Sequence, residues 1–175
     1  MAGVYFEEAA EVKEIAEELI DKYHPHLKDA KHLIGYYFRE GSSDWAGKAK
    51  KCTAFERFVT NKMLFVFISS DAWKAMKHEQ RVALVDHELC HFARKSFKDI
   101  DPKTGDWVEK YEPADQADSW SIREHDVEEF SDVIKRHGLW DTGIEKFAAA
   151  VREADYQMSL DDIEREEGRV LRAVK

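Results

Sequence analysis

The segment His87-Glu88-Leu89-Cys90-His91 places two histidines four residues apart, with a glutamate directly after the first. On an α-helix, residues at this spacing stand one turn above each other, so both imidazoles can face one metal ion. Zinc is the expected metal, because it binds histidine nitrogens at about 2.0–2.1 Å. Glu88 can reach a zinc-bound water without ligating the metal, which suits a general base. The pattern predicts a hydrolytic zinc site.

A catalytic zinc ion normally takes three protein ligands and keeps a fourth position for water, so one ligand must come from elsewhere. The segment 123–130 offers His125 and Glu129 on one face of a predicted helix. We expect His125 to be the third ligand, with Glu129 accepting a hydrogen bond from a ligand imidazole. The reverse assignment, with Glu129 as the ligand and His125 in the pocket, is nearly as good. Glu128 or Asp126 is a further candidate for the third ligand.

Several other polar residues need a role beside the histidine motif. Cys90 points away from the expected ligand face, so we expect a small buried residue and not a zinc thiolate. Asp86 either orients a ligand imidazole or is solvated. Peptide hydrolysis also needs a group that stabilises an oxyanion. Tyr111, Tyr36, Tyr37 or an arginine could supply it.

Hydrophobic spacing predicts the elements that must position these residues. Apolar residues three and four apart predict a helix from 12 to about 23, which Pro25 ends. The segments 32–38 and 63–68 are rich in aromatic and β-branched residues and predict strands. After a short helix, the histidine motif lies on a longer helix expected from 78 to about 95.

The later part of the chain predicts two more helices, one from about 120 to 136 and one from Thr142. The polar stretch that ends at Asp118 fits either a strand or a loop. We expect an α+β fold, in which a small β-sheet packs with the N-terminal helix, the motif helix and a second ligand-bearing helix. Residues 1–158 would form this domain, and residues 159–175 a charged C-terminal helix or tail.

Composition narrows the class of protein. The 175 residues carry a formal net charge of −9, which argues against a chain that coats nucleic acid or an anionic membrane. Two cysteines are too few for a disulfide scaffold, and no apolar run approaches the length of a membrane span. The N-terminal sequence lacks the pattern of a signal peptide. We therefore expect a cytoplasmic protein without a membrane partner.

The histidine motif and two later segments resemble the phage metallopeptidase family. The resemblance covers residues from about 31 to 140 and rests on HELCH at 87–91, HDVEEF at 125–130 and RHGLW at 136–140. It implies a compact zincin-like fold and a zinc-dependent peptidase encoded by a phage or prophage. The order of the expected elements is also similar to the zincin cores of SprT-like and ImmA-like proteases, an analogy that concerns the fold.

The predicted function is a zinc metallopeptidase that acts on a protein or peptide, with Glu88 as general base. The alternative is a non-proteolytic regulatory or nucleic-acid-associated protein that keeps the zincin fold. It would use the basic segment 48–62, although a solvated strand flank is the preferred interpretation of that segment. Glu88 favours catalysis, because zinc binding alone does not require it.

Overall fold

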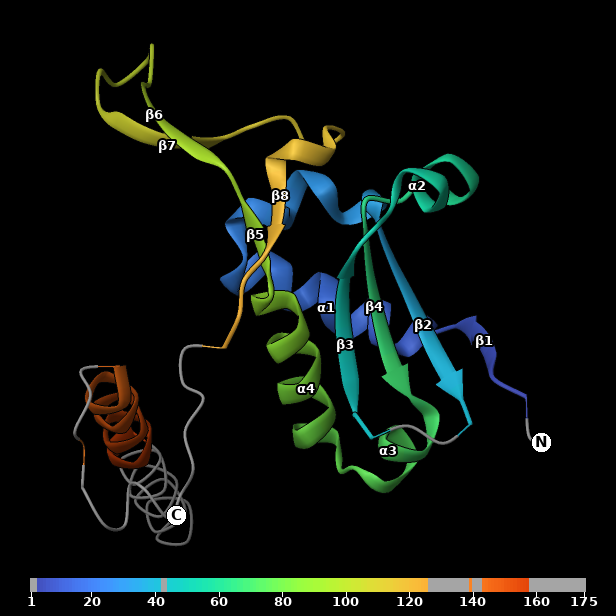
Figure 1. Cartoon of the computed structure of the whole chain (residues 1–175). Coiled ribbons are helices and arrows are strands. Elements are labelled where there is room, and N and C mark those ends of the chain that lie inside the picture. Colours follow the sequence, from blue (N-terminus) through green and yellow to red (C-terminus); the bar gives the residue numbers. More distant parts are fainter. Residues whose placement is uncertain (1–2, 42–43, 126–138, 140–142, 158–175) are drawn as a thin grey trace, which may run out of the picture. The chain divides into compact units, whose positions relative to one another are not determined.

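A computed structural model of the chain describes residues 3–41, 44–125, 139 and 143–157. It contains two compact units, residues 1–124 and residues 125–175. The first unit combines helices with small sheets, which confirms the α+β class (Figure 1). The continuation of the predicted 120–136 helix beyond 125 and the predicted C-terminal segment 159–175 lie outside the described residues.

The first unit is built on a four-stranded sheet with the order β1-β2-β4-β3 (Figure 1). β2 and β4 are parallel, whereas β1 and β3 run antiparallel to their neighbours. The two predicted strands are therefore present, each shifted by one or two residues, and β3 is an edge strand that the sequence did not reveal. The strands are β1 (Tyr5–Glu8), β2 (Ile34–Glu40), β3 (Gly47–Lys51) and β4 (Leu64–Ser69).

Helices α1 and α4 cover one face of this sheet. The predicted N-terminal helix is confirmed as α1, which ends before the 3-10 segment η1, where Pro25 occupies the first position. Val85 and Leu89 of α4 join the hydrophobic core formed by α1 and the covered face of the sheet. The helical segments are α1 (Ala10–Tyr23), η1 (Pro25–Leu33), α2 (Ala54–Thr60), α3 (Ser70–Ala75) and α4 (His78–Cys90).

The helix that carries the histidine motif is shorter than predicted. It ends at Cys90 instead of continuing to about 95, because β5 (Phe92–Arg94) begins there and pairs antiparallel with β8 (Trp120–Ile122). The predicted helix 120–136 is wrong at its start for the same reason, since its first three residues form β8. This strand pairing joins distant parts of the chain, so local periodicity could not indicate it.

The polar stretch between these strands is a β-hairpin. β6 (Ser96–Ile100) and β7 (Trp107–Tyr111) pair antiparallel, and Gly105 supplies a turn residue with φ of +77°. The short 3-10 segment η2 (Ala117–Ser119) then leads into β8.

The second unit contains a described helix over residues 143–157, which confirms the helix predicted from Thr142. Among the described residues, no helix has the length and apolar character needed to cross a membrane.

Candidate metal centre

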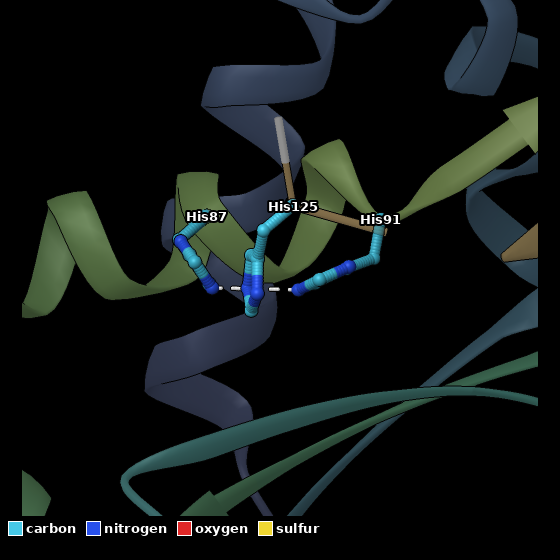
Figure 2. Close-up of side chains that lie close together, drawn as sticks. All are labelled: His87, His91 and His125. Atoms are coloured by element: carbon cyan, nitrogen blue, oxygen red, sulfur yellow. Dashed lines mark hydrogen bonds between the residues drawn. The ribbon is translucent and has the colours of Figure 1, made fainter. Parts of the chain in front are cut away.

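The two motif histidines face each other at the C-terminal end of α4 (Figure 2). Their Nε2 atoms lie 3.3 Å apart, and their rings stand at 80° to one another. Two nitrogens that each bind a tetrahedral zinc ion at 2.0–2.1 Å would be separated by about 3.3–3.4 Å. The donor atoms therefore already have the spacing that a zinc ion requires.

A later part of the chain fixes the ring of His91. The Nδ1–H of His91 donates to the carbonyl oxygen of Arg123 at 2.7 Å, and the backbone N–H of Arg123 donates to the carbonyl oxygen of His91 at 2.7 Å. The second bond continues the antiparallel pairing of β5 and β8. Because Nδ1 carries the proton in this arrangement, Nε2 of a neutral ring keeps its lone pair for a metal ion.

His125 follows Arg123 by two residues. Consecutive Cα atoms are about 3.8 Å apart, so its attachment to Arg123 keeps its backbone near His91. A ring nitrogen of His125 and those of His87 and His91 all lie within 4.8 Å of one another (Figure 2). The role of His125 as third ligand stays a prediction. The competing candidates Glu129, Glu128 and Asp126 lie outside the described residues.

Glu88 is buried against the edge strand β3, with 3% of its surface exposed. The backbone N–H of Ala49 donates to its carboxylate. Gly47 leaves the space that the side chain occupies, since a Cβ atom at this position would lie 2.8 Å from Cδ of Glu88. Burial raises the pKa of Glu88, opposed by nearby His91 and the Ala49 hydrogen bond. A raised pKa makes the carboxylate a stronger proton acceptor.

Two predictions about neighbouring positions on α4 need correction. Asp86 does not orient a motif imidazole in the contact that the structure shows, because its Oδ1 accepts a hydrogen bond from Nε2 of buried His24 at 2.7 Å. Cys90 is exposed and not buried, since Val85 and Leu89 occupy the core side of the helix. Its thiol belongs to a second group of potential ligands, with His24 and Asp86, that does not include the two motif histidines.

The structure does not support the three tyrosines suggested as oxyanion donors. Tyr36 is buried in the core with 5% exposure, and Tyr37 lies on the opposite face of β2. The hydroxyl of Tyr111 donates to Glu109 on the same strand.

Three residues that contribute to this centre could hardly be predicted from their residue types. Gly47 and Ala49 hold Glu88, and the backbone of Arg123 holds His91. Backbone groups carry no residue signature, and the glycine in WAGKAK was the only available hint.

A family model described as "Putative phage metallopeptidase" matches residues 4–152 of this chain. The matched region contains the whole described centre. No curated protein and no solved structure matches the chain.

Proposed function

Because the chain belongs to the family described as "Putative phage metallopeptidase", we propose that it is a zinc-dependent peptidase whose metal ligands are His87, His91 and His125. Membership implies a metal ion and a protein or peptide substrate. The observation that carries the proposal is the 3.3 Å separation of the two motif Nε2 atoms, which fits the edge of a zinc tetrahedron.

The third ligand is proposed from both position and chemistry. His125 offers the imidazole nitrogen that catalytic zinc sites commonly use, and its ring nitrogen lies within 4.8 Å of those of the motif pair. Three such ligands would leave one position for water or substrate. A closed structural site would need a fourth protein ligand.

Zinc held by these residues supplies a Lewis acid that polarises a carbonyl group and lowers the pKa of water. Glu88 takes a proton from the attacking water while the water oxygen forms a bond to the peptide carbon. The same carboxyl then delivers this proton to the amine nitrogen as the carbon–nitrogen bond breaks. The Ala49 N–H keeps the carboxylate of Glu88 in place between the two proton transfers.

The proposed setting is the cytoplasm of a phage-infected or prophage-carrying cell. Neither Cys52 nor Cys90 forms a disulfide, which agrees with a reducing compartment.

Elemental analysis of the purified protein tests the metal site. We expect about one zinc ion per chain, and its loss in His87→Ala and in His125→Ala, because each variant removes one of three ligands. Glu129→Ala should keep the metal. His78→Ala, at the exposed start of the same helix, is the matched histidine control. Failure of the wild-type chain to bind any divalent metal after reconstitution contradicts the proposal.

Peptide cleavage tests the role of Glu88 separately. Glu88→Gln should keep the zinc ion and lose about 10²–10⁴-fold in kcat, because the amide cannot accept the proton of water. A variant that keeps both zinc and full activity would exclude Glu88 as the general base.

A further inference from the structure

The face of the four-stranded sheet opposite α1 and α4 carries a cluster of aromatic rings. Tyr37 lies 5.9 Å from Phe67 with the rings at 30°, and it lies 5.4 Å from Phe65, measured between centroids. Phe6 lies 5.5 Å from Phe67. We call these four residues, Phe6, Tyr37, Phe65 and Phe67, the aromatic face.

Strand register places three cations on the same side of the sheet. Directly paired residues of neighbouring strands point to the same face. Phe67 pairs with Lys48, and Phe65 pairs with Lys50. At the opposite edge of the sheet, Phe6 of β1 pairs with Arg39 of β2. Cations therefore lie beside the aromatic rings on β2 and β3, and one acid of β1, Glu8, pairs with Tyr37 on the same face.

A glycine allows the rings to pack closely over the strands. A Cβ atom at Gly35 would lie 2.8 Å from the Tyr37 ring and 2.9 Å from the Phe65 ring. Gly35 thus leaves the space over β2 into which the Tyr37 and Phe65 rings pack.

These residues line a cavity of about 550 Å³. Three cations, Arg39, Lys48 and Lys50, contribute to its wall, together with a single carboxylate, Glu56, which pairs with Lys50 at 2.5 Å. The guanidinium of Arg39 also lies over the Trp45 ring at 5.5 Å. The cavity wall is therefore net positive, although the chain carries a formal charge of −9.

Part of the aromatic surface is open to solvent. Phe6 is 57% exposed, and on α2, which contributes Glu56 and Thr60 to the cavity, Phe55 is 71% and Phe58 is 82% exposed. Such an exposed group of large apolar side chains marks an interaction surface more often than an ordinary protein surface.

We propose that the aromatic face binds single-stranded DNA, with bases stacked on Phe6 and Phe67 and phosphates beside Arg39 and Lys48. Aromatic rings bordered by cations on an open sheet are what an unpaired strand requires, since each base offers a flat face and each phosphate a charge. A duplex hides its base faces. Stacking and charge do not need a ribose 2′-hydroxyl, so DNA satisfies this chemistry.

Fluorescence anisotropy of a fluorescein-labelled 12-residue oligothymidine tests the proposal with the full chain at low salt. Phe6→Leu and Phe67→Leu should each weaken binding about fivefold to tenfold, because leucine keeps apolar bulk and removes the stacking surface. Lys48→Gln should weaken binding and reduce the slope of log K against log salt by about 1. Phe97→Leu and Lys98→Gln, on exposed positions of β6, are matched controls that should bind like wild type.

Competing ligands distinguish single-stranded DNA from other ligands that this surface could bind. An RNA of matching sequence, a 12-base-pair duplex, a peptide of glutamate and phenylalanine, or an anionic vesicle that bound more tightly than oligothymidine would overturn the proposal. Absence of oligothymidine binding at low salt, or equal losses in the β6 controls, would also overturn it. Glu88→Gln and metal-free protein should bind DNA like wild type, so this test is independent of peptidase activity.

Discussion

The two faces of the central sheet use the same strands for different purposes. On β4, Leu64, Val66 and Ile68 point into the core and are fully buried, whereas Phe65 and Phe67 point to the other face. On β4 the covered side carries aliphatic side chains only, and with Tyr36 of β2 they belong to the core against which α4 and its histidines pack. On the other side β4 carries aromatic rings, of which Phe65 is buried with 5% exposure, and β3 contributes lysines beside them. The difference shows that alternation along one strand can separate scaffold from surface chemistry.

The edge strand β3 makes this contrast sharpest. Gly47 leaves the space that the Glu88 carboxyl group occupies, and the backbone N–H of Ala49 donates to that carboxyl group. Lys48 and Lys50 alternate with them and lie beside the aromatic face. One five-residue strand therefore serves the candidate metal centre with one side and the proposed DNA surface with the other.

The largest difference between the two faces should be found in stability. Ile68→Ala removes a fully buried side chain and should lower the free energy of unfolding by about 2–4 kcal/mol through the cavity that it leaves. Phe6→Ala, at a position 57% exposed, should cost less than about 1 kcal/mol. Urea unfolding measures both values. Equal losses would mean that the aromatic face is a second core and not a surface.

A buried charge outside the four-stranded sheet, Arg94 of β5, should matter through its partner. The Arg94 side chain is 2% exposed, and its guanidinium donates to both carboxylate oxygens of Asp29. Asp29→Asn should lower the free energy of unfolding by about 1–2 kcal/mol at neutral pH, because Arg94 stays buried without its counter-charge. This expected loss is smaller than the loss for a fully buried ion pair, because the Asp29 side chain is 66% exposed and water screens its charge.

The difference in free energy of unfolding between wild type and Asp29→Asn should decrease as the pH falls. Arg94 holds the pKa of Asp29 below its usual value, so the folded state binds fewer protons there than the unfolded chain. The stabilisation is complete above the unfolded pKa of about 4 and is lost as the pH falls through the lowered folded value. Urea unfolding of wild type and Asp29→Asn should therefore converge in acid. A gap that persists unchanged at about pH 2 would contradict the assignment.

Substitution on β3 should separate its two sides by activity. Gly47→Ala places a methyl group where the Glu88 carboxyl lies, so the carboxyl must shift, and we expect about tenfold lower kcat/KM with zinc retained. Lys48→Ala, one residue along on the opposite face, should leave peptide cleavage unchanged. If the two variants lose activity equally, the two sides of β3 are not functionally distinct.

The smallest effect concerns the side-chain hydroxyl of Tyr36, which is buried on the covered face of β2. The hydroxyl of Tyr36 has no hydrogen-bond partner among the described residues, and burial raises its pKa. Tyr36→Phe should therefore leave the free energy of unfolding unchanged or raise it by up to about 1 kcal/mol. A clear loss of stability in thermal unfolding would show that the hydroxyl is satisfied in the folded protein.

Local patterns in the sequence predicted α1, β2, β4 and the start of α4, because their apolar residues repeat at the spacing of one element. The histidine motif was also visible, since its chemistry depends on neighbours within one helical turn. β3 was hidden because its lysines alternate with small residues and look like a solvated flank. The end of α4 and the strand β8 depend on pairing between distant segments, which local spacing does not contain.

The base of the β6–β7 hairpin has a consequence for how the chain can vary. The backbone N–H of Lys95 donates to the carbonyl oxygen of Ser119, and that of Glu112 donates to the carbonyl oxygen of Lys95. These bonds hold the two ends of the hairpin segment together. The pairing of β5 with β8 lies outside this closed loop, and loop-closure entropy changes slowly with length. Insertions or deletions at the hairpin tip can therefore accumulate during evolution without displacing the ring of His91.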